Sequence, residues 1–256
     1  MALGMSDELL PMVVPIAVYW ITSGIYYLLG LHSGEKHRLF TEEEEDIQNL
    51  ATKRQVLVGV VVNQAIQLVV IGLVTMLQGT TAAAAAPPPT LLRQAWQMAV
   101  AYLIIDAWEY FFHRMTHEIK FLYKHVHAMH HRMIVPYSFG AQYIHPLDAF
   151  FGNMVDSALA TTVTGMSPRT ATVLFSLMAV KSIDDHCALW FPNNPFHRFF
   201  TNNSAYHAIH HQHYGIKYNY SGFYLATWDK LLGTAMPFTV EERKGGGYQI
   251  RTAKDD

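Results

Sequence analysis

Histidine is the residue type whose number and spacing in this sequence point most directly to chemistry. Fifteen histidines occur in 256 residues, and H-x-x-x-H at 113–117 is followed by H-x-x-H-H at 127–131 and again at 207–211. On a helix, positions i, i+3 and i+4 share one face, so each cluster can direct two or three imidazoles to one point. Neutral imidazole binds iron, zinc, copper and nickel, and eight ligands exceed what one ion can take, so two metal ions are expected. The predicted ligands are His113, His117, His127, His130, His131, His207, His210 and His211.

Two carboxylates precede the first histidine pair on the same helical stripe. Asp106, Glu109, His113 and His117 lie at offsets 0, 3, 7 and 11, which at 100° per residue span an arc of about 80°. Carboxylates within an apolar run are costly and are usually functional. We therefore expect Asp106 and Glu109 to accept hydrogen bonds from the outer N–H groups of ligating histidines. Carboxylates that face interfacial water would show the same pattern.

Two more histidines border an apolar hairpin between the H-x-x-H-H clusters. His186 follows Asp184 and Asp185 where the hairpin returns. We expect His186 to be a further ligand and Asp185 to accept a hydrogen bond in its surroundings. His145 stands before Pro146 at the start of the hairpin. It is a weaker candidate, because the residues leave it open as a ligand or as an ordinary loop histidine.

The composition indicates a membrane protein or a protein with a very large core. Hydrophobic residues make up 51% of the chain and charged residues 15%, whereas soluble domains carry roughly 25% charged residues. The net charge of -2 favours no nucleic-acid partner. Cys187 is the single cysteine, which excludes a disulfide within the chain and a cysteine-rich metal site.

Three long apolar runs are separated by polar segments. Leu9–Leu31 and Val56–Leu77 contain no charged residue over 23 and 22 positions, and about 20 residues suffice to cross a bilayer core of about 30 Å. The third run, Ala95–Phe112, holds the two carboxylates as its only charges. We expect each run to be a helix.

Two shorter apolar stretches, 149–164 and 170–183, flank the sequence Gly-Met-Ser-Pro, which is typical of a tight turn. They predict a helical hairpin. Because the two H-x-x-H-H clusters must meet, an even number of crossings or a re-entrant hairpin has to separate them, and this hairpin supplies it. Basic residues concentrate in 32–55, in 113–145 and in the tail from Lys181. The positive-inside rule therefore places these segments in the cytosol and the N-terminus in the lumen.

The expected fold is an all-α integral membrane protein. About four transmembrane or hairpin helices would carry a cytosolic helical cap that holds the di-metal site. Residues 1–92 would form an N-terminal helix pair with a cytosolic loop and an Ala/Pro linker at Gly79–Pro89. Residues 93–240 would form the catalytic domain, and 241–256 a polar tail.

The histidine array resembles that of the fatty acid hydroxylase superfamily, which includes sterol desaturases and sterol methyl oxidases. The segment from Tyr218-Asn219-Tyr220 to Trp228-Asp229-Lys230-Leu231-Leu232-Gly233-Thr234 is similar to its closing motif. Segments 124–127, 132–138, 165–170 and 193–197 resemble more closely the plant sphingoid-base C-4 hydroxylases. Ala188 stands where the family usually has glycine after a His-Ser or His-Cys dipeptide.

This resemblance implies a membrane-bound di-iron monooxygenase that hydroxylates C-4 of sphinganine, free or in dihydroceramide, to the phytosphingosine type. It implies two iron ions, which zinc can replace in a preparation. It also implies molecular oxygen and electrons from NAD(P)H through cytochrome b5 and its reductase, as separate proteins. Residence in the endoplasmic reticulum membrane follows from the same resemblance. Ceramide synthase or a second copy of the chain are further candidate partners.

Other functions fit parts of the pattern. A sterol methyl oxidase, a sterol desaturase or an acyl-chain 2-hydroxylase would use the same chemistry. Only the segments that resemble the plant sphingoid-base C-4 hydroxylases argue against them. A metal transporter would place polar ligands near the bilayer midplane. Here the clusters flank the apolar runs at their cytosolic end, which favours an enzyme.

Overall fold

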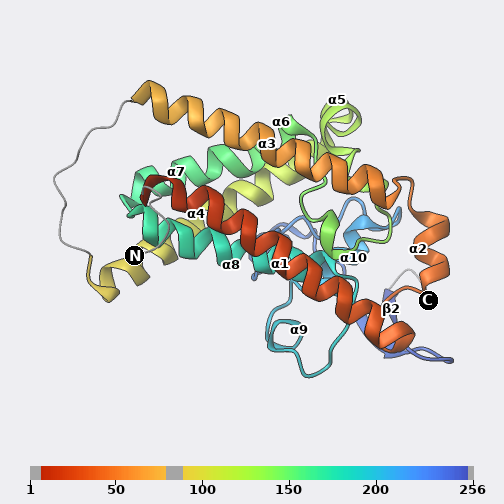
Figure 1. Cartoon of the computed structure of the whole chain (residues 1–256). Coiled ribbons are helices and arrows are strands. Elements are labelled where there is room, and N and C mark those ends of the chain that lie inside the picture. The colour runs from red at the N-terminus through yellow and green to blue at the C-terminus, as the bar shows by residue number, and fades with distance from the viewer. Residues whose placement is uncertain (1–6, 79–88, 253–256) are drawn as a thin grey trace.

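Long helices packed side by side dominate the computed structural model, which describes residues 7–78 and 89–252 (Figure 1). Four of them, of 19 to 28 residues, run along the whole bundle: α1 Leu10–Ser33, α3 Lys53–Gln78, α4 Leu91–Glu118 and α8 Pro168–His186. The shorter α7, Val155–Thr164, packs against α4. The apolar runs of the sequence therefore fold as the expected helices, and the Ala/Pro linker at 79–88 lies outside the described residues.

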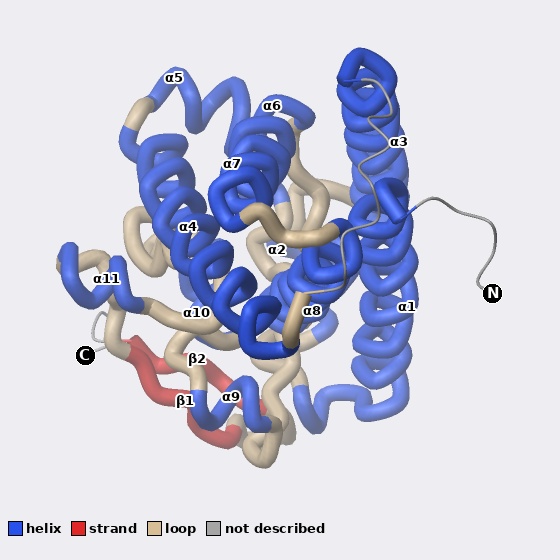
Figure 2. Tube along the Cα trace, turned by 90° about the vertical axis from the view of Figure 1, so that its left-hand side faces the viewer, coloured by secondary structure: helices blue, strands red, loops and turns tan. Residues whose placement is uncertain are grey.

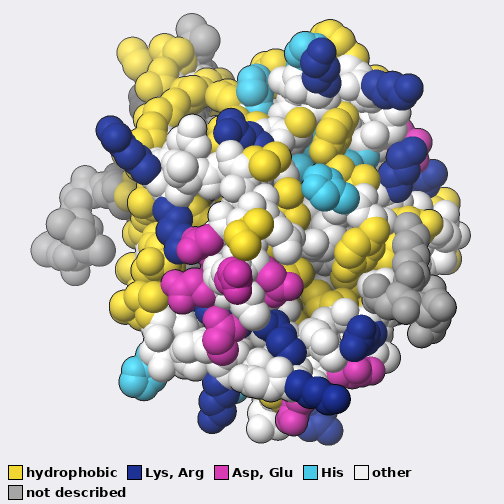
Figure 3. Space-filling view, turned by 90° about the vertical axis from the view of Figure 1, so that its right-hand side faces the viewer, with side chains coloured by type: hydrophobic (Ala, Val, Ile, Leu, Met, Phe, Trp, Pro, Cys, Tyr) yellow, Lys and Arg dark blue, Asp and Glu magenta, His cyan; other side chains and the backbone are white. Residues whose placement is uncertain are grey.

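Short elements gather at one end of the bundle and form its cap (Figures 1 and 2). The helical elements are η1 Asp7–Leu9, η2 Gly34–His37, α2 Glu42–Gln48, α5 Lys120–Leu122, η3 Tyr123–His127, η4 His130–Arg132, η5 Ser138–Gly140, α6 Pro146–Asp148, η6 Ala149–Met154, α9 Pro195–Phe199, α10 Ser204–His211 and α11 Thr227–Leu232. Of these, η1 leads into α1 and η6 leads into α7, so neither belongs to the cap. Exposed acidic side chains of α2 mark the cap in Figure 3, while Glu45 is buried beside Arg38 and Lys53.

The hairpin predicted around residue 166 is confirmed. α7 ends at Gly165, whose φ of 59° is left-handed and suits a glycine C-cap. Ser167 caps α8 by accepting from the Thr170 amide, and Pro168 occupies the first turn, where its missing N–H costs nothing. Arg169 then pairs with Asp7 of η1 at 2.9 Å, which joins η1 to this turn.

Two apolar cores hold the bundle together. One joins α4, α7 and α8 through Ala101, Ile105, Ala160 and Leu174. The other joins α1 and α3 to the cap, through residues that include Tyr19, Val60, Met133, Tyr143 and Ile183. The second core lies beneath the histidine-bearing segments and ties them to the long helices.

The outer faces of the long helices are apolar. Exposed side chains include Ile21 and Leu28 on α1, Val61 and Val69 on α3, and Leu103 on α4. Two stretches, Asp7–His37 and Lys53–Val74, are long and apolar enough to cross a membrane by length and composition. Exposed apolar surface of this extent is typical of a lipid-facing surface.

The expectation of an all-α chain is wrong at its C-terminal end. β1 Phe238–Glu242 pairs antiparallel with β2 Tyr248–Thr252, so the boundary expected between 240 and 241 falls inside β1. Gly245, Gly246 and Gly247 have φ between 74° and 108°, and these left-handed values make the hairpin turn. Two short runs rich in β-branched and aromatic residues around a glycine turn are the sequence signal for this hairpin.

Candidate metal centre

Nine histidine rings converge in the cap as two groups. Within each group the metal-binding ring atoms all lie within 4.8 Å of one another. The first group is His113, His117, His127, His131 and His210, and the second is His130, His186, His207 and His211. The structure therefore brings together all eight clustered histidines and His186.

Four parts of the chain deliver these rings. The last two turns of α4 carry His113 and His117, and the last residue of α8 is His186. A π-helical turn, η3, ends at His127, and wide turns of this kind are frequent at functional sites. α10 supplies the third cluster and is capped by Asn203, which accepts from the Tyr206 amide at 3.1 Å. His130 and His131 follow in the 3-10 turn η4, so the first and third clusters lie on α-helices, whereas the second spans a π-helical turn and a 3-10 turn.

Hydrogen bonds to the outer ring nitrogen fix the tautomer of six rings. A carbonyl or carboxylate oxygen can only accept, so Nδ1 carries the proton and Nε2 keeps its lone pair. The acceptors are the carbonyl oxygens of Tyr220 for His113 (2.8 Å), Tyr143 for His130 (3.2 Å), Ser182 for His186 (2.7 Å), Tyr218 for His210 (2.7 Å) and Met133 for His211 (2.8 Å), and the Asp148 carboxylate for His127 (2.7 Å).

The inner nitrogens face one another at short range. Nε2 of His113 lies 3.1 Å from Nε2 of His127, and Nε2 of His207 lies 3.0 Å from that of His186. His113 and His127 both hold their proton on Nδ1, so their facing Nε2 lone pairs repel, and a metal ion between them would relieve that repulsion. Ligands about 2.1 Å from one metal ion lie roughly 3.0–3.4 Å apart. The rings therefore fit two metal ions, one in each group.

Burial keeps the rings in the form that binds metal. Burial first, and neighbouring imidazoles second, hold the pKa of His130, His131 and His210 well below the usual histidine range. The pKa values of His207 and His211 are lowered in the same direction, also chiefly by burial. Neutral imidazole is the ligating form, so these rings need lose no proton to accept a metal ion.

Asp148 is a site residue that the sequence interpretation missed. Its Oδ2 accepts the Nδ1 proton of His127 at 2.7 Å, and both side chains are buried. A carboxylate on the outer nitrogen orients a ligating ring and raises its basicity. A carboxylate at the start of an apolar hairpin, three residues after His145, was the signal that could have identified it.

The carboxylates predicted from the sequence have other neighbours. Asp106 accepts from the Tyr102 hydroxyl at 3.4 Å, and Glu109 lies against the backbone at Gly222. Asp185 pairs with the fully buried Lys181. Across residues 7–78 and 89–252, no hydrogen bond joins these three carboxylates to a ring of either group.

His145 lies outside both histidine groups, which corrects its weaker prediction as a ligand. Its Nδ1 accepts the Leu147 amide at 3.2 Å and caps α6. The residue before a proline is held in an extended conformation, which suits a cap position. His145 therefore positions the turn that carries Asp148.

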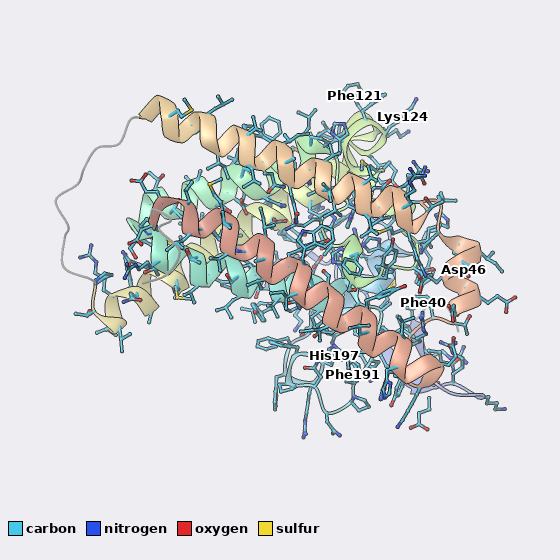
Figure 4. All side chains as sticks on the ribbon, in the orientation of Figure 1. Phe40, Asp46, Phe121, Lys124, Phe191 and His197 are labelled. Atoms are coloured by element: carbon cyan, nitrogen blue, oxygen red, sulfur yellow. The ribbon has the colours of Figure 1, made fainter. Side chains whose placement is uncertain are left out.

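A second polar network anchors the end of α8. Asp184 is buried and accepts from the Tyr26 hydroxyl at 2.6 Å and from Nε2 of His197 at 3.2 Å. Nδ1 of His197 accepts the Phe191 amide, so the ring is neutral with its proton on Nε2. Figure 4 shows His197 and Phe191 close together below α1. The hydrogen bonds of Asp184 therefore join α1 and the α9 segment to α8, two residues before His186.

Ala188 has an unfavourable backbone conformation, with φ of 48°. Left-handed geometry costs an ordinary residue about 1 kcal/mol relative to glycine. We expect Ala188→Gly to stabilise the protein by roughly 0.5–1 kcal/mol, measured as a higher unfolding temperature in detergent. Ala205→Gly, within α10, is the matched control and should lower that temperature. An unchanged or lower value for Ala188→Gly would contradict the strain.

The sequence of this chain is similar to those of several known enzymes. A family model described as fatty acid hydroxylase matches residues 98–234. Sphinganine C4-monooxygenase 2 of Arabidopsis thaliana is 47% identical over 99% of this chain and 98% of its own length. A very-long-chain aldehyde decarbonylase of Oryza sativa subsp. indica is 44% identical over 98% and 97%, respectively. The sphingolipid C4-hydroxylase of Saccharomyces cerevisiae is 34% identical over 90% and 72%. No solved structure matches.

Proposed function

Because the chain belongs to the fatty acid hydroxylase family, we propose that it is a membrane-bound monooxygenase that hydroxylates C-4 of the sphinganine long-chain base. The observation that carries the proposal is the 47% identity, over nearly the full length, to an enzyme named for this reaction. The converging histidines support it, because the C-4 methylene of an alkyl chain offers no acidic proton and no leaving group. General acid–base chemistry alone has no means of attacking such a carbon.

The nine converging histidines are the proposed ligands of two iron ions, and zinc can replace iron in a preparation. Bound iron would supply the redox chemistry that activates molecular oxygen. The overall reaction consumes one O2, two electrons and two protons, places one oxygen atom between C-4 and its hydrogen, and releases the other as water. We propose that NAD(P)H supplies the electrons through cytochrome b5 and its reductase.

The chain itself would hold the rings and exclude water. Backbone carbonyls and Asp148 hold the outer nitrogens of six rings, so the inner lone pairs of these six rings would stay directed at the metal ions. Burial of His210 and His211, which are 0% and 2% exposed, supports a site closed to the cytosol. The sphinganine chain would then reach the site from the bilayer.

We propose a multi-pass protein of the endoplasmic reticulum membrane, with the histidine groups on the cytosolic side. A glycosylation acceptor placed after Gly245 should stay unmodified, because this hairpin packs against the cap at Arg38. An acceptor in a spacer inserted at 82–86 should be modified, because we expect this segment in the lumen. The positive-inside rule places the basic segments on the other side of the membrane, in the cytosol. The modification is measured as a mobility shift removed by a glycosidase. The reverse pattern would overturn this orientation.

Aldehyde decarbonylation is the second candidate function, because the rice relative named for it is also similar over nearly the whole chain. The two functions differ in product. Expressed in a host that lacks its own C-4 hydroxylase, the chain should yield long-chain bases with a hydroxyl at C-4. Loss of very-long-chain aldehyde without C-4 hydroxylated base would favour the decarbonylase instead. Hydroxylated sterol or 2-hydroxy acyl chains would favour the other family reactions.

A further inference from the structure

The segments that link the histidine clusters project outward from the bundle. α5 lies between His117 and His127, α9 lies between His186 and His207, and α11 follows the last cluster. Figure 2 shows α5, α9 and α11 on three different sides of the bundle. α5 and α9 lie at similar positions along its length (Figure 1). In Figure 2 these three short helices thus follow the outside of the bundle from α5 past α11 to α9, on the side away from α1 and α3.

Each short helix exposes a large apolar side chain next to a basic one. Phe121, Phe199 and Leu231 are 68%, 73% and 70% exposed. Their basic neighbours are the exposed Lys124, Arg198 and Lys230. Figure 4 shows Phe121 of α5 and Lys124 of the adjoining η3 on the outside of the molecule. We call these three exposed apolar side chains the tips. An exposed apolar side chain beside a long cationic one is typical of segments that lie at a membrane interface.

Two of these helices are tied to the histidine groups by buried contacts. Asp229 of α11 accepts from the Tyr206 hydroxyl of α10 at 2.8 Å and from the Tyr220 amide at 3.0 Å. The same Tyr220 accepts from His113 through its carbonyl. α9 is held through His197 and Asp184, two residues before His186. The exposed side chains of α9 and α11 are therefore held in a fixed position relative to the histidine groups.

We propose that α5, α9 and α11 form a collar that lies in the headgroup layer of an anionic bilayer leaflet. The apolar tips would enter the acyl boundary by about 5–10 Å, and the basic side chains would contact lipid phosphates. A leaflet with anionic lipids fits because basic side chains near the surface are attracted to its negative surface potential. Charge complementarity thus argues for a lipid surface over a second protein.

The collar also explains how one carbon could be selected, which rests on the proposed function. C-4 of a long-chain base lies three bonds from its C-1, beside the polar head. When the polar head of the long-chain base stays in the headgroup layer, C-4 lies just below that layer. Histidine groups held at that depth by the collar would meet C-4 rather than carbons further down the chain.

The depth of the tips can be measured without any activity. Single nitroxide labels at Phe121→Cys, Phe199→Cys and Leu231→Cys would be compared in vesicles of phosphatidylcholine and phosphatidylserine. Accessibility to oxygen relative to a water-soluble nickel complex reports depth. Val69→Cys on α3 serves as the deep control and Glu43→Cys on α2 as the aqueous control, since both positions are exposed. The native chain treated with the same nitroxide reagent gives the background from Cys187, which is buried.

We expect all three labels to lie at one shallow depth between the two controls. Labels as open to the nickel complex as position 43 would overturn the collar. Protection from both reagents would also overturn it, because it would indicate a protein partner. Vesicles of phosphatidylcholine alone should leave the tips closer to water, and an unchanged depth would remove the role of lipid charge. A shallow depth in a chain that does not hydroxylate sphinganine would refute the proposed function and leave the collar standing.

Discussion

Replacing His207 by alanine is expected to abolish hydroxylation and to lower the bound metal from two ions toward one per chain. His207 is buried, and its Nε2 lies 3.0 Å from that of His186 and 3.1 Å from that of His211. Its group has four rings, so the change leaves three. Loss of a group that only supports a ligand typically costs 10- to 100-fold, so we expect loss of a ligand to cost more than about 100-fold.

The matched control for this change is His145→Ala. His145 caps α6 and lies outside both groups, so its variant should keep both metal ions and measurable activity. Metal would be counted by elemental analysis of purified protein, with membrane insertion and unfolding temperature checked in both variants. Two bound ions and native turnover in His207→Ala would contradict the ligand assignment.

Asp148→Asn should weaken metal binding and activity by about 10- to 100-fold without abolishing either. Asparagine keeps the shape of the side chain and removes the charge that favours the His127 N–H. The negative charge of Asp148 also offsets the positive charge that the His127 ring takes on when it binds a metal ion. The measurement is metal retention against a graded series of chelator concentrations, together with initial rates at each occupancy.

Glu109→Gln tests whether this effect is specific to Asp148. Glu109 is on the same helix as His113 but makes no hydrogen bond to a ring in the described residues, so its variant should retain metal like the native chain. Equal loss of metal in both variants would show that any nearby negative charge suffices. Full retention in Asp148→Asn would contradict a role for the Asp148–His127 contact.

The sequence identified the converging rings because helical periodicity is local. Spacings of three and four residues place rings on one face wherever the helix lies. How the rings divide between two groups is not local. His210 joins the first group while His207 and His211 join the second. That division depends on how α10 packs between α4 and α8, which no spacing within the chain reports.

The partners of the rings were harder to predict for the same reason. Five of the six outer nitrogens donate to backbone carbonyls, which leave no mark on the sequence. Asp106 and Glu109 share the helical stripe of His113, yet the loop at Tyr220 takes the position they were expected to hold. The apolar runs were the most reliable signal, because a bilayer-length stretch without charge has few alternatives to a helix.

The most direct test of the central proposal is the origin and position of the new oxygen atom. Purified protein in vesicles, supplied with sphinganine, electrons and isotopically labelled dioxygen, would be analysed by mass spectrometry of the long-chain base. Our account predicts one labelled oxygen atom, located at C-4, and no product in the His207→Ala variant. An unlabelled hydroxyl, a label at another carbon, or conversion of an aldehyde with no C-4 product would contradict it.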